Sequence, residues 1–341
     1  MPQVITFGEI MLRLAPEGFL RFLQADRFGA SYSGAEANVA VALANFGLDT
    51  AFVSRLPENE IGQAALNYLR KFGVNTDFIS RSENGRTGIY FLEKGAGSRP
   101  SKVIYDRAGS AISLSSPSDY DWDKIFDGSR IFMLSGITPA LSDNLADICL
   151  QACKKAKEKG LTIVFDLNYR KKLWTVEKAR KCMEKICSLA DICITNEEDA
   201  SLIFGIKKPQ KDFSSLDLEG YKKVASELAD RFPFKKLCIT LRESKSASLN
   251  GWAGLLYEKN GEHFYQSKKY EIHIVDRVGA GDAFTAGIIY GEIKKMDCQS
   301  QLEFAAASGC LKHSIEGDFN IVSLNEVLSL AAGNSNGRVE R

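Results

Sequence analysis

The chain has 341 residues, of which 45% are hydrophobic and 26% are charged, and this is the ordinary balance of a globular protein with a substantial core. Its 44 basic and 43 acidic residues nearly cancel, which excludes a strongly basic nucleic-acid-binding protein and a charge-driven hold on acidic membranes. No uncharged apolar run approaches the roughly 20 residues of a transmembrane helix, and the N-terminus enters a strand pattern without a signal peptide. We therefore expect a cytoplasmic protein with no nucleic-acid or membrane partner.

The elements predicted in chain order alternate between short apolar runs and helical patterns. The apolar runs predict buried strands over residues 4–7, 51–54, 130–134, 162–165, 192–195 and 237–241. Apolar residues at helical spacing predict helices over residues 36–46, 61–72, 143–159, 176–188, 197–204, 221–231, 283–295 and 302–313. The alternation predicts an α/β fold, a single domain over residues 1–330 with helices on both faces of a mostly parallel sheet. The polar residues 331–341 are expected to form a flexible tail.

Two stretches, about residues 11–32 and 87–107, break this alternation. Each reads as a pair of strands with no helix between them, and apolar residues alternate at positions such as Leu12, Leu14 and Ile89. Inserted strands of this kind predict a small separate layer. The alternative is a pair of peripheral hairpins with no role in binding.

Eight cysteines are scattered along the chain without any Cys-x-x-Cys spacing, and there are only three histidines. The cysteines lie within apolar patterns, so we expect reduced thiols in the core of an intracellular protein rather than disulfides or metal ligands. The histidines have neither the spacing of a zinc site nor that of a His-based triad.

The most informative stretch lies near the C-terminus and reads Asp-Arg-Val-Gly-Ala-Gly-Asp-Ala-Phe over residues 276–284. A helical pattern follows it, so the backbone N–H groups of Gly279, Ala280 and Gly281 would open a helix and form an anion site. Asp282 would lie beside the anion, where a carboxylate can take a proton from a hydroxyl. An anion site next to a base is what phosphoryl transfer to an alcohol requires. The alternative is a glycine-rich turn that Asp282 only caps.

Two other glycine motifs are excluded by direct reading of the chain. Phe284 stands where the third glycine of Gly-x-Gly-x-x-Gly would be, and the stretch lies at the wrong end of the chain for a dinucleotide fold. No Gly-x-x-x-x-Gly-Lys-Ser/Thr sequence occurs, which excludes a P-loop. A Rossmann oxidoreductase is therefore disfavoured. A non-catalytic sugar- or nucleotide-binding protein is also disfavoured, because a binding module needs no base at Asp282.

Residues 276–284 resemble the D-T-x-G-A-G-D-x-F signature of the ribokinase-like (PfkB) family of carbohydrate kinases, with Arg277 in place of the usual Thr. Residues 33–47, Ser-Gly-Ala-Glu-Ala-Asn-Val-Ala-Val-Ala-Leu-Ala-Asn-Phe-Gly, resemble the N-terminal glycine signature of the same family. The resemblance covers nearly the whole chain. It implies a three-layer αβα fold in which the inserted strands form a β lid over the sugar. It further implies ATP as donor and Mg²⁺ as cofactor. A monovalent cation near the anion site is possible, and the sequence does not decide whether one binds.

The resemblance places the sugar among residues of three segments. Gly34 and Asn38 open a helix, and their alternative role is tight helix packing. The lid strands carry Tyr90, Tyr105 and Arg107, although an exposed arginine is most often only a solvated charge. An Asp-x-Asn-x-Arg run follows a strand at its carboxyl end, where ligands of open α/β sheets bind. The substrate-binding residues predicted in this way are Gly34, Asn38, Tyr90, Tyr105, Arg107, Asp166, Asn168 and Arg170.

Arg107 and Arg170 together would clamp a carboxylate, which suits the planar fork of a guanidinium group. The lid motif Tyr-x-Arg-x-x-Ser-Ala and the helix start Gly-Ala-Glu-Ala-Asn resemble 2-keto-3-deoxygluconate kinases within the family. The resulting hypothesis is a kinase that phosphorylates the terminal hydroxyl of this sugar acid. The alternative is a kinase for a neutral sugar such as fructose or another ketose.

The nucleotide side is predicted from the same resemblance. Asp199, one methylene shorter than the usual Glu of the family, is expected to contact Mg²⁺ indirectly, although an acidic helix start also satisfies the helix dipole. Residues 305–310 carry small side chains that either pack helices closely or form an adenine slot. The predicted nucleotide-binding residues are Asn196, Thr240, Arg242, Gly279, Gly281, Ser308 and Gly309. Exposed edges of the lid strands predict a homo-oligomer.

Overall fold

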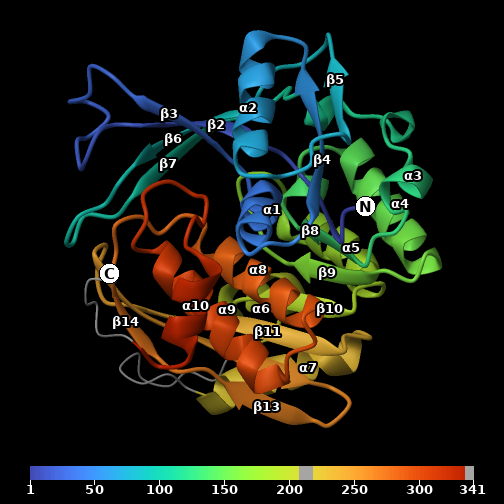
Figure 1. Ribbon diagram of the computed structural model, residues 1–341, viewed down its shortest axis with the longest axis vertical. Coiled ribbons are helices and arrows are strands. Elements are labelled where there is room, and N and C mark those ends of the chain that lie inside the picture. Colours follow the sequence, from blue (N-terminus) through green and yellow to red (C-terminus); the bar gives the residue numbers. More distant parts are fainter. Residues whose placement is uncertain (207–217, 335–341) are drawn as a thin grey trace.

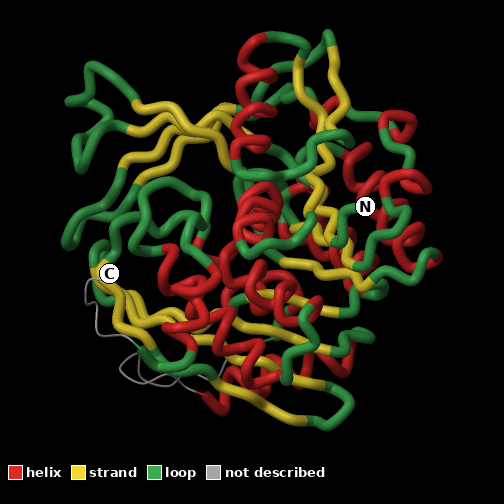
Figure 2. The backbone as a smooth tube through the Cα atoms, viewed as in Figure 1, coloured by secondary structure: helices red, strands yellow, loops and turns green. Residues whose placement is uncertain are grey.

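The computed structural model describes residues 1–206 and 218–334, and its main body is a large sheet between two layers of helices (Figures 1 and 2). Seven neighbouring strands of this sheet are parallel. In spatial order they are β11 (Lys236–Ser244), β10 (Ile192–Thr195), β9 (Thr162–Asp166), β8 (Ile131–Ser135), β1 (Val4–Phe7), β4 (Thr50–Pro57) and β5 (Ile79–Ser82). The predicted three-layer α/β fold with a mostly parallel sheet is confirmed.

The sequence did not predict every element of this body. An antiparallel strand, β12 (Leu249–Glu258), extends the sheet beyond β11, and both β13 (His263–Gln266) and β14 (Tyr270–His273) pair with it. Some of these strands, including β5, are short, and others have no flanking helix, which is the signal by which a parallel strand is recognised in the sequence. The short C-terminal helix α10 (Leu324–Ala331) was also missed. Residues 335–341 of the predicted tail lie outside the described residues.

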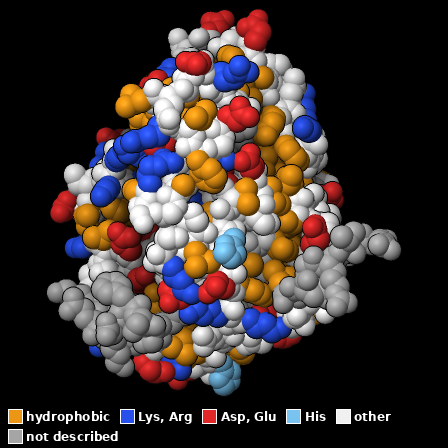
Figure 3. All heavy atoms as spheres, turned by 90° about the vertical axis from the view of Figure 1, so that its left-hand side faces the viewer, with side chains coloured by type: hydrophobic (Ala, Val, Ile, Leu, Met, Phe, Trp, Pro, Cys, Tyr) orange, Lys and Arg blue, Asp and Glu red, His pale blue; other side chains and the backbone are white. Residues whose placement is uncertain are grey.

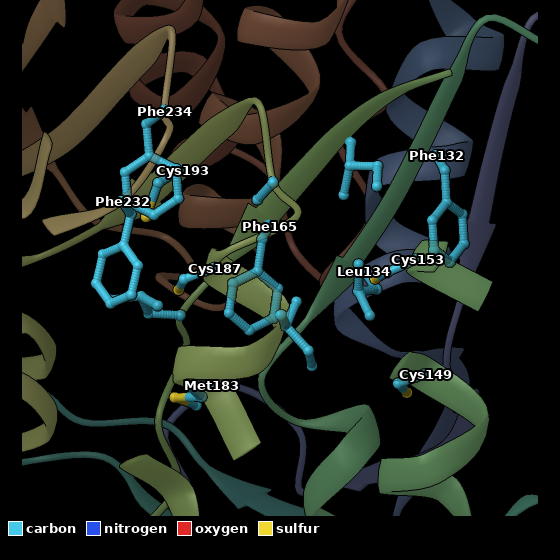
Figure 4. Packing of buried hydrophobic residues seen from close by; sticks show 14 of the residues in the cluster. Phe132, Leu134, Cys149, Cys153, Phe165, Met183, Cys187, Cys193, Phe232 and Phe234 are labelled. Atoms are coloured by element: carbon cyan, nitrogen blue, oxygen red, sulfur yellow. The ribbon is translucent and has the colours of Figure 1, made fainter. Parts of the chain in front are cut away.

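Alternate side chains of each strand enter two different cores. In β8, Phe132 and Leu134 face one layer of helices, whereas Ile131 and Met133 face the other. The first layer, seen from close by in Figure 4, also holds buried cysteines such as Cys153. It consists of α4 (Asp143–Glu158), α5 (Val176–Cys187), α6 (Glu197–Phe204) and α7 (Leu218–Arg231). The second layer consists of α1 (Ala35–Asn45), α8 (Ala280–Ile293), α9 (Cys298–Lys312) and α10, while α2 (Glu60–Lys71) packs on the outer side of α1.

A separate sheet of four strands projects from the main body as the predicted lid (Figure 1). Its strand order is β3 (Gly29–Ser33), β2 (Met11–Ala15), β6 (Ile89–Glu93) and β7 (Lys102–Asp106). Tyr90 and Tyr105 are direct partners across β6 and β7, so the two predicted lid tyrosines lie side by side. The lid adjoins the carboxyl ends of the parallel strands, and this junction positions the site. Within the described residues, no helix combines the length and apolarity needed to cross a bilayer.

Candidate active site

A cavity of about 330 Å³ lies between the lid and the carboxyl ends of β1, β9, β10 and β11. The N-termini of α1 and α8 also open onto it. The cavity brings together most of the residues predicted from the sequence, although they come from segments far apart in the chain. Its lining includes Gly34, Asn38, Tyr90, Tyr105, Arg107, Asp166, Asn168, Arg170, Asn196, Thr240, Arg242, Gly279, Gly281 and Asp282.

The turn before α8 has the backbone geometry of an anion site. The helix begins at Ala280, three residues earlier than the sequence predicted, and Gly279 caps it at φ 85°, a left-handed conformation that favours glycine. A β-carbon on Gly279 would lie 2.0 Å from the carbonyl oxygen of Asp318, so no side chain fits there. The first N–H groups of a helix have no intrahelical partner, and here they open onto the cavity with the positive end of the helix dipole.

Asp282 lies in the first turn of α8 and its carboxylate is almost completely buried. The amide Nδ2 of Asn38 donates a hydrogen bond of 2.6 Å to its Oδ2 atom. Burial raises the pKa of Asp282 to about 7; the hydrogen bond from Asn38 opposes this rise, and the charge of Asp318 adds to it. A carboxyl group with a pKa near neutrality, beside an anion site, is suited to accept a proton from a hydroxyl. Asn38, predicted to contact the sugar, lines the cavity and also binds the Asp282 carboxylate through its amide group.

Glu9, which the sequence analysis missed, contacts two of the predicted substrate residues. The backbone carbonyl of Glu9 packs against Gly34, where a β-carbon would lie only 1.8 Å from the oxygen. This backbone contact therefore requires the absence of a side chain at Gly34. The carboxylate Oε2 of Glu9 accepts hydrogen bonds from Arg107, including one of 2.8 Å from Nε. Its Oε1 atom is buried without a partner in the described structure.

The two lid tyrosines have different surroundings. The Tyr105 ring lies 5.5 Å from the Arg107 guanidinium carbon, which places both at the cavity as predicted. Tyr90 is buried, and its hydroxyl contacts Ser33 at 2.8 Å and donates to Asp318 at 2.6 Å. The Tyr90 ring therefore forms part of the cavity wall, while its hydroxyl belongs to a hydrogen-bond network within the protein.

That network joins the lid to the turn before α8. Arg13 of β2 forms buried ion pairs with Asp276 and Asp318, the first at 2.6 Å. Asp276 also accepts a hydrogen bond from the backbone N–H of Val278 at 3.1 Å. A lid strand is thus tied electrostatically to the residues that shape the anion site.

The run after β9 points into the cavity as predicted. Asn168 adopts a positive φ of 35°, which asparagine tolerates better than most residues, and its amide lies 3.5 Å from the carboxylate of Asp166. Burial, followed by the charges of Asp282 and Asp199, raises the pKa of Asp166 well above its usual range. Arg170 lines the same cavity and is exposed within it.

On the nucleotide side, Asn196 caps α6 and also fixes Asp199. Its Oδ1 accepts from the Asp199 backbone N–H at 2.8 Å, and its Nδ2 donates to the Asp199 carboxylate at 2.9 Å. The backbone N–H of Tyr169 donates to the same carboxylate at 3.2 Å. Burial raises the pKa of Asp199 to about 6. Asp199 does not line the central cavity; it lines the wider, adjoining cleft of about 870 Å³.

Arg242 lies beside the anion site. An ideal β-carbon on Gly281 would be 3.5 Å from its Nη2 atom, and its guanidinium stacks over Trp252 at 5.2 Å. Arg242 is exposed to the cavity, but desolvation by the cavity walls, followed by the nearby charges of Arg170 and Arg277, lowers its pKa. Arg277 itself donates to the backbone carbonyl of Ala247 at 3.1 Å, so its guanidinium group is held by the β11–β12 turn.

Two predicted nucleotide-binding residues, Ser308 and Gly309, do not line the central cavity. Ser308 is fully buried: its hydroxyl donates to the carbonyl of Ala283 at 2.8 Å and accepts from Asn320 at 3.0 Å. Gly309 packs against Trp252, whose ring would be 2.5 Å from a β-carbon at this position. Ser308 and Gly309 therefore pack closely against α8 and β12, and their contact with a nucleotide stays a prediction.

Comparison with known proteins decides the class of this site. A family model for pfkB family carbohydrate kinases matches residues 1–320. The chain belongs to the pfkB family of carbohydrate kinases. The kinase is 50% identical to a solved 2-dehydro-3-deoxygluconokinase from Thermotoga maritima, with a TM-score of 0.93 over 98% of this chain and 100% of that one.

Curated relatives of the kinase carry related names. A 2-dehydro-3-deoxygalactonokinase from Haloferax volcanii is 33% identical over 98% of both chains. A 2-dehydro-3-deoxygluconokinase from Bacillus subtilis is 26% identical over 95% of this chain and 94% of its own. The carbohydrate kinase activity expected from the two glycine signatures is thereby confirmed.

Three residues in or beside the cavity that sequence reasoning missed share one property. Glu9, Arg13 and Asp318 are buried charges that interact with groups far away in the chain. Glu9 did carry a signal, since it follows Gly8 at the carboxyl end of the first predicted strand, where ligands of such sheets bind. Arg13 sits within an alternating strand pattern, which gives no sign that its outward position would become buried.

Proposed function

We propose that the kinase transfers the γ-phosphoryl group of ATP to the terminal hydroxyl of 2-keto-3-deoxygluconate, giving 2-keto-3-deoxy-6-phosphogluconate. The observation that carries this proposal is the presence of two unpaired arginines in the cavity beside Asp282. Within the described chain, no carboxylate pairs with Arg170 or Arg242 within ion-pair distance, although both line the cavity. Unpaired guanidinium groups in a cleft are suited to a substrate carboxylate and to phosphates.

The earlier idea of a clamp made by Arg107 and Arg170 needs one amendment. Because Glu9 already accepts hydrogen bonds from Arg107, the charge of Arg107 is largely compensated within the protein. We infer that Arg170 supplies the net positive charge that binds the substrate carboxylate. The remaining N–H groups of Arg107 would orient that carboxylate through hydrogen bonds. The unpartnered Oε1 of Glu9 offers an acceptor for a sugar hydroxyl.

The proposed transfer uses Asp282 as base. The sugar hydroxyl oxygen attacks the γ-phosphorus, the bond from that phosphorus to the β–γ bridging oxygen breaks, and the hydroxyl proton passes to Asp282. Backbone N–H groups of Gly279, Ala280, Gly281 and Asp282 hold the charge that grows on the transferring oxygens. ADP then leaves, and the proton on Asp282 is lost to solvent before the next turnover.

Mg²⁺ is proposed as the cofactor, and when bound it would neutralise negative charge on the phosphate oxygens. Among residues 1–206 and 218–334, no cluster of three or more His, Cys, Asp or Glu side chains could hold a metal alone. This fits an ion that keeps several waters and relies on the phosphates. Asp199, whose carboxylate is already bound by Asn196, would contact it through water. The proposal assigns no monovalent cation.

A second sugar acid is also a candidate, because the relative from Haloferax volcanii is named for the galactonate epimer. The two acids share the carboxylate and differ only at one hydroxyl, so Arg170 cannot discriminate between them. A neutral ketose such as fructose lacks the carboxylate and would leave Arg170 without a ligand.

The lid is proposed as the contact between copies of the kinase. The lid carries exposed apolar side chains, and within the part of the chain that the structure describes its outer strands β3 and β7 each have an unpaired edge. Figure 3 views the molecule from the side on which the lid projects and shows hydrophobic side chains among Lys and Arg. The exposed apolar lid residues are Phe19, Leu20, Leu23, Phe28 and Ile104. An unpaired edge with apolar neighbours invites a second strand, and sedimentation of wild type against a Leu23→Asp variant tests this contact.

The deciding experiment is a coupled ADP-release assay with Mg-ATP and a panel of sugars. The panel holds 2-keto-3-deoxygluconate, its galactonate epimer, gluconate, fructose, ribose and an adenosine control. We expect the highest kcat/KM for 2-keto-3-deoxygluconate. A preference for fructose or ribose would refute the role of Arg170, and an equal rate with both epimers would widen the substrate to the class of 2-keto-3-deoxy acids.

A further inference from the structure

Lys312, the last residue of α9, is a fully buried lysine that the mechanism above does not use. An ammonium group without solvent is costly unless it is well bound, and buried lysines are rare for this reason. Its Nζ donates to two backbone carbonyls, that of Asp276 at 3.3 Å and that of Ile315 at 3.2 Å. Among the described residues, no carboxylate lies within ion-pair distance of it, so its ligands are carbonyl oxygens.

The two carbonyls belong to the segments that build the anion site. Asp276 begins the turn that leads to Gly279, and Ile315 lies in the loop that carries Asp318, whose carbonyl fills the space beside Gly279. The backbone N–H of Asp276 also donates to the carbonyl of His313 at 3.2 Å. Lys312 thus ties the turn before α8 to the loop after α9.

The charge of Lys312 matters as well as its hydrogen bonds. The buried network contains the acids Asp276 and Asp318, and Arg13 alone would leave it with one uncompensated negative charge. Burial is the largest influence and lowers the pKa of Lys312, as does the charge of Arg13, whereas the charges of Asp276, Asp318 and Asp282 favour its protonated form. A net negative charge beneath the turn would oppose the binding of phosphate on its other side.

We propose that Lys312 is a positioning residue that serves as the built-in cation of the anion site, so that the kinase needs no added monovalent cation. The ammonium group holds the carbonyls of Asp276 and Ile315 as a bound K⁺ or NH₄⁺ ion would. This inference rests on the proposed use of the α8 turn for phosphoryl transfer, but not on which sugar is the substrate.

The first test uses the wild-type kinase with the Tris salt of ATP and a sugar from the panel. We expect kcat to be equal within about twofold in KCl and in tetramethylammonium chloride. A wild type that requires K⁺ would overturn the proposal. This arm needs no variant, so it decides the matter even where a substitution at position 312 prevents folding.

The second test compares Lys312→Ala, which leaves room for an ion, with Lys312→Met, which fills the space without a charge. We expect both to lose at least about tenfold in kcat, and only Lys312→Ala to recover in a saturable way with K⁺ or NH₄⁺. Lys236→Met is the matched control, because Lys236 is a largely buried lysine bound to Glu292 far from the cavity. It should lower the melting temperature without any cation-dependent change in kcat.

The third readout separates this inference from the choice of sugar. The affinity for a non-hydrolysable Mg-ATP analogue is measured without sugar, in the presence and absence of K⁺. Lys312→Met should bind the analogue more weakly than wild type and Lys236→Met. Wild-type turnover and wild-type nucleotide affinity in a folded Lys312→Met variant would show that Lys312 has only a structural role.

Discussion

The hydrogen bond from Asn38 to Asp282 predicts how the activity responds to pH. Asn38→Leu keeps the branched shape of the side chain and removes the amide donor that lies 2.6 Å from the Asp282 carboxylate. Both residues are buried, so water cannot easily replace the lost bond. A hydrogen bond to a charged group is worth about 1.5–3 kcal/mol, and one pKa unit corresponds to about 1.4 kcal/mol. The pKa of Asp282 should therefore rise by about one to two units.

The sign of the effect follows from the role of the base. Asp282 must be ionised to accept a proton, and its pKa is about 7 in the wild type, so half of the molecules are competent near pH 7. With a pKa of roughly 8 to 9, between about 1 and 10% of molecules would be competent at pH 7, a loss of about 5- to 50-fold in kcat/KM. The loss should largely disappear above about pH 9, where both proteins are ionised.

The assay is kcat/KM for the sugar between about pH 5.5 and 9.5 at saturating Mg-ATP. Asn45→Leu is the matched control, because Asn45 lies on the same helix and donates to the carbonyl of Val322, away from the cavity. The protonation of ATP changes with pH in the same way for both variants. Only the difference between their pH profiles of kcat/KM therefore reports on Asp282. If Asn38→Leu lowers kcat/KM equally at all pH values, Asn38 does not tune the base, or Asp282 is not the base.

Three further predictions concern the same cavity. Asp282→Asn should lower kcat by about 100-fold or more while sugar affinity, measured by titration calorimetry, and the melting temperature stay near wild type; near-normal turnover would exclude Asp282 as the base. Gly279→Ala should destabilise the fold, because the residue has a positive φ and its β-carbon would meet the Asp318 carbonyl. The structure has room for a β-carbon at position 281, so Gly281→Ala should keep the wild-type melting temperature but lose turnover. Equal melting temperatures for the two variants would contradict this. Arg170→Met should raise KM for the sugar acid by roughly 10- to 100-fold and leave any weak activity on fructose unchanged, so an unchanged KM would place the carboxylate elsewhere.

Some features of this kinase follow from the sequence alone because they are local. The alternation of apolar runs and helical patterns identified the parallel core of the sheet, since burial on both faces leaves a continuous apolar run. The stretch 276–284 predicted a helix start next to glycines, which the structure shows with Gly279 as a left-handed cap, and its use as an anion site stays a prediction. Lid strands could be recognised because they interrupt the alternation. Strands β12, β13 and β14 gave no comparable signal, because no helix separates them.

Tertiary structure decided which polar groups meet. Asn38 and Asp282 are 244 positions apart, and Arg13 and Asp318 are 305 apart, so no local pattern could pair them. Packing brings the Asn38 amide to the Asp282 carboxylate and the Ser308 hydroxyl to the Ala283 carbonyl, two contacts that the sequence did not predict. A buried charge or amide must find a partner, and which partner it finds depends on how distant elements pack. Residue types thus predicted a carboxylate beside a helix start, and only the fold decided which distant groups contact that carboxylate.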